Sequence, residues 1–141
     1  MFNHRGAQRK TRRRAEDIMT ISDLTGRIIS CSMKVHSGLG PGLLESAYEA
    51  CLYYELVNSG LVVDKQKPMP LTYNEVRMDI GYRIDLLVEQ SVIIEIKSAD
   101  ALNDVHLSQI LTYMKLSGCN VGLLINFNVR HLKDGIKRVI L

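Results

Sequence analysis

Residues 82–97 constrain the fold more than any other part of the chain, because charged and apolar residues alternate along them in two runs. Successive side chains of a strand point to opposite faces. In the first run one face would carry Tyr82, Ile84, Leu86 and Val88, and the other Arg83, Asp85 and Leu87. In the second run one face would carry Val92, Ile94 and Ile96, and the other Ile93, Glu95 and Lys97. The pattern predicts a β-hairpin with the charges of each strand gathered on one side.

The register of this hairpin decides whether its carboxylates meet. Asp85 lies opposite Glu95 only if the connecting loop has an odd length, as in the three residues Glu89-Gln90-Ser91. A two-residue loop would place the two carboxylates on opposite faces of the sheet. We therefore predict the three-residue loop, and opposite faces would exclude a shared metal site.

Asp85, Glu95 and Lys97 together point to metal-assisted phosphate chemistry. Two carboxylates, with the backbone carbonyl of Ile96 between them, could hold one Mg²⁺ and leave room for a phosphate oxygen and a water. Lys97 could orient that water or stabilise the developing negative charge. The alternative is an ordinary cross-strand ion-pair cluster, because Glu-x-Lys alone is common in strands.

Two predicted helices could add to this site. His106, Gln109 and Tyr113 share a face of a helix at 104–117, where Gln109 could fix Lys97 or a phosphate and Tyr113 could donate to a phosphate oxygen. The alternative is the polar boundary of an amphipathic helix. Glu45 falls in the first turn of a helix at 43–59, either as a dipole-stabilising carboxylate or as a third ligand. His36 could join the same cluster, or serve as a core or capping histidine.

The remaining pattern predicts an α/β sandwich around a mixed sheet. We expect a helix at 20–37, strands at 61–66, 70–73, 76–80 and 121–127, and a last short helix at 131–139. The core face of the helix at 43–59 is expected to use Leu44, Ala47, Cys51 and Leu52.

Composition places the chain in a broad class. Its 141 residues, 46% of them apolar, suit one domain, and the three cysteines lack zinc-ligand spacing and are expected to be buried thiols. No apolar run reaches the ~20 residues of a membrane span, and the N-terminus lacks a secretory signal. A cytoplasmic protein is expected.

The net charge of +3 comes from the N-terminus. Residues 1–14 hold six basic residues and no acidic ones, leaving 12 basic and 15 acidic residues in the remainder. We expect residues 1–18 to be a flexible tail, in which Arg12, Arg13 and Arg14 could contact nucleic-acid phosphates. The alternatives are a merely solvated tail, which its composition favours, and translation that starts at Met19.

The motifs resemble a known family. Gly42-Leu-Leu-Glu45-Ser-Ala-Tyr48 is similar to the motif of the GxxExxY protein family, and Asp85…Glu95-Ile-Lys97 followed by Gln109…Tyr113 resembles the signature of the PD-(D/E)XK nuclease superfamily. The resemblance implies a three-layer sandwich with a mixed central β-sheet, a restriction-endonuclease-like αβββαβ core, over residues 19–141. It implies Asp85 and Glu95 as metal ligands and Lys97 as the catalytic lysine. It also implies Glu45 as the carboxylate of the first core helix, with Gln109 and Tyr113 in support.

These observations lead to one expected function and to rivals. We expect a Mg²⁺- or Mn²⁺-dependent endodeoxyribonuclease that binds DNA, and a homodimer would suit the cutting of two strands. The alternatives are a catalytically silent nucleic-acid-binding or protein-interaction module, and a small-molecule phosphodiesterase. Residues 15–141 carry a net negative charge, so they would bind duplex DNA only if basic residues gather near the site. The residues considered for this are Lys65, Lys67, Arg77, Arg83 and Lys115.

Overall fold

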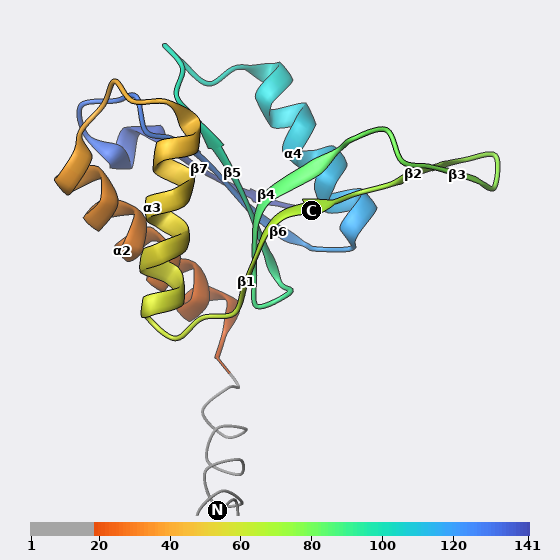
Figure 1. Ribbon diagram of the computed structural model, residues 1–141, viewed down its shortest axis with the longest axis horizontal. Coiled ribbons are helices and arrows are strands. Elements are labelled where there is room, and N and C mark those ends of the chain that lie inside the picture. Colours follow the sequence, from red (N-terminus) through yellow and green to blue (C-terminus); the bar gives the residue numbers. More distant parts are fainter. Residues whose placement is uncertain (1–18) are drawn as a thin grey trace, which may run out of the picture.

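The computed structural model describes residues 19–141, so the basic tail with Arg12, Arg13 and Arg14 lies outside the described residues. A central sheet is covered by two helices on one face and by one on the other (Figure 1). Helices α2 (Ile21–Leu39) and α3 (Glu45–Asn58) share the first face, and α4 (Asp104–Ser117) covers the second. In the described part, the sheet has five strands in the order β1 (Val63–Pro68), β4 (Arg83–Val88), β5 (Val92–Lys97), β6 (Val121–Asn126) and β7 (Ile136–Ile140).

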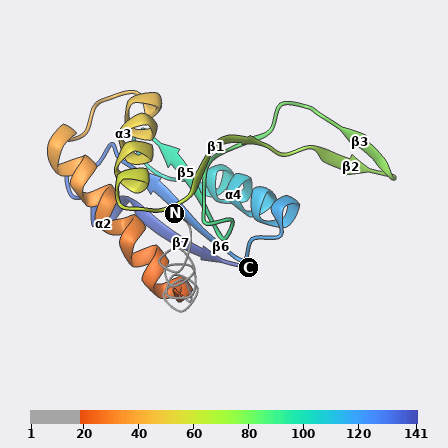
Figure 2. The ribbon, with the colours of Figure 1, turned by 60° about the horizontal axis from the view of Figure 1, so that its bottom comes forward.

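This architecture confirms the predicted three-layer sandwich with a mixed sheet. Strands β5 and β6 run parallel, and the other neighbours in the sheet are antiparallel. The chain order α3, β1, β4, β5, α4, β6 is the αβββαβ core, with a small hairpin of β2 (Leu71–Tyr73) and β3 (Val76–Met78) inserted after β1. That hairpin projects away from the sheet (Figure 2). No helix between Met19 and Leu141 is long and apolar enough to cross a membrane.

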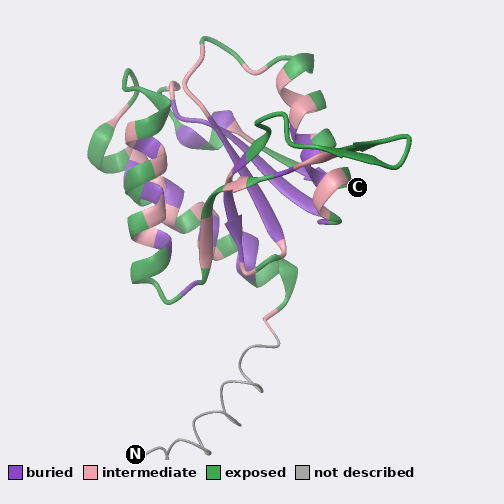
Figure 3. Ribbon diagram, turned by 45° about the vertical axis from the view of Figure 1, so that its right-hand side comes forward, coloured by how far each residue is buried: buried purple, intermediate pink, exposed green. Residues whose placement is uncertain are grey.

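Two apolar cores lie on the two faces of the sheet, and its central strands are almost wholly buried (Figure 3). Helix α4 packs very closely on β6 because Gly122 has no side chain. A Cβ at that position would lie 2.9 Å from Cδ1 of Ile110 and 3.0 Å from Sδ of Met114. The ends of α4 follow local chemistry. Asn103 caps its first turn and Gly118 ends it with a φ of 80°.

Three sequence predictions are wrong in whole or in part, and a fourth, on β4, is described below. The core face of α3 is formed by Tyr48, Leu52 and Leu56, whereas Leu44 is 77% exposed, because Tyr48 stacks on Phe127 and thereby sets the rotation of the helix. The segment predicted as a last helix forms a 3₁₀ turn, η1 (Leu132–Gly135), and then strand β7, which pairs with the otherwise open edge of β6. Of the cysteines expected to be buried, Cys119 is buried, Cys31 is partly buried and Cys51 is exposed.

The predicted register of the β4–β5 hairpin is confirmed. Leu86 pairs with Ile94 and Val88 with Val92, which leaves the three-residue loop 89–91. The faces of β5 are also as predicted, since Ile94 and Ile96 pack toward α2 and α3 while Ile93 packs toward α4.

Strand β4 departs from the predicted alternation. Ile84 packs with Leu87 on the α4 side, whereas Leu86 lies on the opposite side. The expected single apolar face is therefore broken at Asp85. The β1–β4 pairing is interrupted at the same place, where Gln66 has a φ of 52°. This distortion frees the backbone at Asp85 from regular pairing on both sides.

Candidate active site

Asp85 and Glu95 lie together where β4 and β5 stop pairing. The regular ladder ends at Leu86 and Ile94, and beyond it the carboxylates accept backbone hydrogen bonds from the opposite strand. The N–H of Asp85 donates to Oε1 of Glu95 at 3.2 Å, and the N–H of Ile96 donates to Oδ2 of Asp85 at 2.9 Å. The prediction that the two carboxylates meet is therefore confirmed.

The electrostatics of this pair are unfavourable for two negative charges. Glu95 is only 3% exposed, and burial, reinforced by the charge of Asp85, raises its pKa to about 9. Burial also raises the pKa of Asp85. Between residues 19 and 141 the only ion pair within 4.0 Å joins Lys34 and Glu55, so neither carboxylate forms one there. The charge of Lys97 lowers the pKa of both carboxyls, but by less than burial raises it. Such a pair is suited to a bound cation, which would favour both ionised forms.

Lys97 is held by α4, as the helical spacing of its partners suggested. Its Nζ donates to Oε1 of Gln109 at 2.8 Å, and Nε2 of Gln109 donates to the hydroxyl of Tyr113 at 3.4 Å. A cavity of about 510 Å³ opens beside these three residues, with Tyr82 packed edge-on against Tyr113. His106 also lines this cavity, but its Nδ1 accepts the N–H of Asn103 as part of the helix cap.

The first turn of α3 is attached to the chain directly after Lys97. The N–H of Ser98 donates to Oε2 of Glu45 at 3.3 Å, and the Ser98 hydroxyl donates to the carbonyl of Leu43 at 2.6 Å. Buried Tyr48 fixes the preceding loop, since its hydroxyl donates to the Gly40 carbonyl at 2.6 Å and accepts the N–H of Leu43 at 3.1 Å. Glu45 therefore lies at the same end of the sheet as the hairpin carboxylates.

Two residues that the sequence analysis missed connect these elements. Nε2 of Gln66 donates to Oε1 of Glu49 at 2.7 Å and to Oδ1 of Asp85 at 3.2 Å. Burial, with the charge of Asp85 next, raises the pKa of Glu49. Glu49 follows Glu45 by four residues, so the helical spacing could have identified it. The strand pattern gave no indication that Gln66 belongs to the site.

His36 does not join the carboxylates. Its Nε2 lies 2.7 Å from the carbonyl oxygen of Val129, in the loop that follows β6. Asn126 holds the start of that loop: its Nδ2 donates to the carbonyl of Ala99 at 2.9 Å, and its Oδ1 accepts the N–H of Ala99 at 3.0 Å. His36 is thus a support for this loop.

The donor set of the site fits a hard cation that keeps water ligands. Within residues 19–141, no group of three or more His, Cys, Asp or Glu residues is arranged to hold a metal. Mg²⁺ binds proteins through one or two carboxylates and retains several waters. The N–H and C=O of one strand residue point to the same neighbouring strand. The carbonyl of Ile96 is therefore directed to the side where its N–H meets Asp85.

The fold and this site together agree with the comparison to known families. The model of the PD-(D/E)XK nuclease superfamily matches residues 22–139. The chain therefore belongs to the PD-(D/E)XK nuclease superfamily, and this membership supports a nuclease-type function. Searches of curated proteins and of solved structures gave no match.

Proposed function

We propose that this chain is a divalent-metal-dependent nuclease that hydrolyses phosphodiester bonds in DNA, within the GxxExxY family. One observation carries the proposal: two buried carboxylates, neither in an ion pair within 4.0 Å among the described residues, meet where β4 and β5 separate, and Lys97 lies beside them. Superfamily membership independently supports nucleic-acid cleavage.

Asp85 and Glu95, with the carbonyl of Ile96, would hold Mg²⁺ or Mn²⁺. A bound ion of this kind supplies charge to stabilise the phosphoryl oxygens and lowers the pKa of a coordinated water. The two carboxylates are already oriented, because each accepts a backbone hydrogen bond from the opposite strand. Little reorganisation is then needed when the ion binds.

The other residues of the site act on the substrate side. Lys97 would orient the attacking water and stabilise the negative charge that develops on the phosphate. Gln109 is a positioning residue, since its hydrogen bond fixes the Lys97 ammonium. Tyr113 is proposed to donate to a phosphate oxygen, and Glu45 to add a carboxylate at the edge of the site. Arg12, Arg13 and Arg14 are proposed to contact DNA phosphates.

Cleavage by the full chain tests the proposal. Plasmid and branched DNA are incubated with Mg²⁺, with Mn²⁺ or with a chelator, using wild type, Asp85→Ala and Lys97→Ala. We expect cleavage only with metal and wild-type protein. DNA binding without cleavage across these substrates and metals would overturn the proposal and favour the catalytically silent binding module.

A further inference from the structure

A second cavity lies outside the carboxylate site, between the end of α2 and the loop that follows β6. Its volume is about 490 Å³. His36, Arg130, His131 and Lys133 are four of its nine lining residues, and none of the nine is acidic. We call this cavity the Arg130 pocket. The rest of the lining is neutral, so an anion is the ligand that its charge favours.

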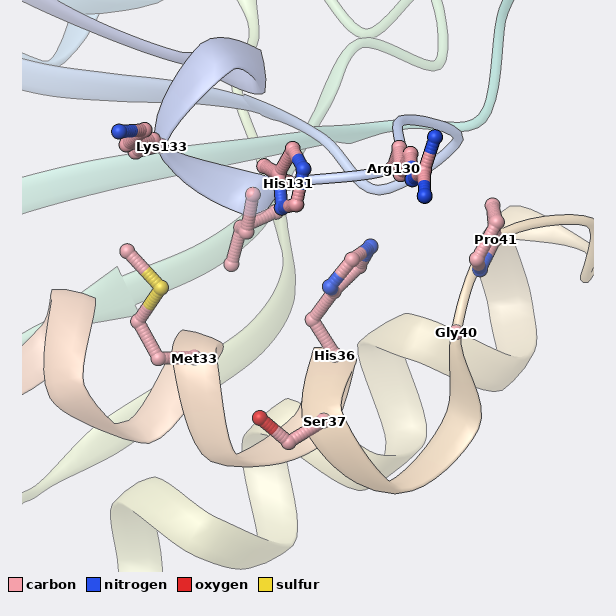
Figure 4. Close-up of a pocket in the computed structure, with 9 residues that line it drawn as sticks. Met33, His36, Ser37, Gly40, Pro41, Arg130, His131 and Lys133 are labelled. Atoms are coloured by element: carbon pink, nitrogen blue, oxygen red, sulfur yellow. The ribbon is translucent and has the colours of Figure 1, made fainter.

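The basic side chains of the Arg130 pocket come from two sides of it (Figure 4). His36 projects from α2 toward the loop that bears Arg130 and His131, and the Arg130 guanidinium stands between His36 and Pro41. Lys133 lies on the far rim. Because the only ion pair within residues 19–141 is Lys34–Glu55, no carboxylate in that part of the chain neutralises Arg130. A guanidinium matches a phosphate with two parallel hydrogen bonds.

Arg130, His131 and Lys133 are exposed, but hydrogen bonds to neighbouring elements hold the backbone of the loop that carries Arg130. His36 binds the carbonyl of Val129 at 2.7 Å, directly before Arg130. Nδ2 of Asn128 donates to the carbonyl of Ala99 at 3.3 Å. At Gly135, a Cβ would collide with the backbone oxygen of Asn126, so only glycine lets η1 close against this loop.

The Arg130 pocket and the carboxylate site share one end of the sheet. Asn126 is the register partner of Lys97, and the N–H of Phe127 donates to the Lys97 carbonyl at 2.9 Å. The four residues that follow Asn126, up to Arg130, can span at most ~14 Å. On the other wall, the chain runs from Gly40 to Leu43, whose carbonyl accepts the Ser98 hydroxyl. One nucleic-acid strand could therefore contact both places.

We propose that the Arg130 pocket binds a backbone phosphate of the DNA strand that is cut at Asp85 and Glu95, a few nucleotides from the scissile bond. This inference rests on the proposed nuclease function. Arg130 would hold the phosphate, and His131 and Lys133 would add charge at the rim. Residues 15–141 are acidic overall, and binding of DNA to them requires positive charge near the site. The pocket would supply that charge.

Binding measured without cleavage separates this inference from the proposed function. Labelled DNA is titrated with the full chain in a metal chelator at several salt concentrations, using Arg130→Gln, His131→Asn and the control Lys137→Gln. Lys137 is an exposed lysine of β7 outside the pocket. We expect Arg130→Gln to weaken binding about tenfold and to lower the slope of log affinity against log salt by about 0.9, the value for one phosphate contact on duplex DNA.

The controls define what would overturn the inference. Loss of affinity in Arg130→Gln no larger than in Lys137→Gln, with unchanged unfolding midpoints, would overturn it. Inorganic phosphate should perturb the ring signals of His36 and His131 in NMR spectra, and DNA should displace it. Phosphate bound there that DNA does not displace would indicate a free-phosphate site and would overturn the assignment to a DNA strand. Arg130-dependent binding by a chain that never cleaves would overturn only the nuclease function.

Discussion

The N–H of Asp85 donates to Oε1 of Glu95, so the two carboxylate residues occupy the point where β4 and β5 separate. A regular hairpin would place a backbone carbonyl at such a position. Here the carboxylates replace those acceptors, and neither forms an ion pair within 4.0 Å among residues 19–141. We therefore expect the proposed metal to stabilise the fold, because an ion that binds only the folded chain raises its stability.

The first prediction concerns the stability of Glu95→Gln without metal. Burial raises the pKa of Glu95 from its ordinary value of 4.5 to about 9 in the folded protein, so between these pH values the folded state keeps a proton that the unfolded state has lost. Wild-type stability therefore falls as pH rises through this interval, and a neutral glutamine side chain removes that loss. We expect Glu95→Gln to be more stable by on the order of 2 kcal/mol at pH 7, and the difference to disappear below about pH 4.5. Urea unfolding in a chelator from pH 4 to 9 measures it.

Glu75→Gln is the matched control, because Glu75 is exposed at the β2–β3 turn. It should unfold like wild type at every pH. Added Mg²⁺ should raise the unfolding midpoint of wild type and of Glu75→Gln but not that of Glu95→Gln. A wild-type stability that does not change between pH 5 and 8 would contradict the prediction.

The second prediction separates Lys97 from the metal ligands. Lys97 bonds to Gln109 and carries a positive charge, so it should act on the phosphate and water and not on the ion. We expect Lys97→Met to cut DNA roughly 10²–10³-fold more slowly, as when one transition-state donor is lost. The stabilisation of this variant by Mg²⁺ should match that of wild type. Lys137→Met, an exposed change on β7, is the control, and equal activity of the two variants would refute the role of Lys97.

Features that depend on neighbouring residues in the chain were predictable. The alternation in β5 fixed the side of Glu95 and Lys97, and the loop of three residues fixed their register against β4. The cap at Asn103 and the stop at Gly118 set the bounds of α4. These signals are local, because each depends on backbone geometry within one or two turns of chain.

Features that depend on distant partners were not predictable. Leu132, Ile136 and Val139 have helical spacing, yet residues 136–140 form a strand because β6 offers an unpaired edge. The position of Ile84 depends on a distortion at Gln66. No sequence pattern predicted the positive φ of this residue. Gln66 reached the site only through its contacts with Glu49 and Asp85, which come from separate elements.

The third prediction assigns Gln66 to the orientation of Asp85. Gln66→Gly removes the amide that joins Asp85 to Glu49, while glycine readily adopts the φ of 52° at this position. We expect Mg²⁺ affinity, measured by calorimetry, to fall about tenfold, as when the support of a metal ligand is lost. The fold should remain intact by circular dichroism.

Gln90→Gly is a close control for this change. Gln90 has a φ of 54°, and its side-chain amide also binds a carboxylate, that of Asp64, away from the site. The two variants therefore share the backbone effect and differ only in the carboxylate that is released. Equal metal affinity of Gln66→Gly and Gln90→Gly would exclude a positioning role for Gln66.

The fourth prediction tests whether Tyr48 holds the loop that leads to Glu45. Tyr48→Phe keeps the stacking on Phe127 but leaves the Gly40 carbonyl and the Leu43 N–H without their side-chain partner. We expect a loss of about 1–3 kcal/mol in the free energy of unfolding by urea, since a backbone group left unpaired by such a change costs that much. Tyr54→Phe, on the same helix but with Tyr54 63% exposed, should cost almost nothing. If both variants unfolded alike, the hydroxyl of Tyr48 would not hold the loop, and the placement of Glu45 beside Ser98 would have to depend on the Ser98–Leu43 hydrogen bond.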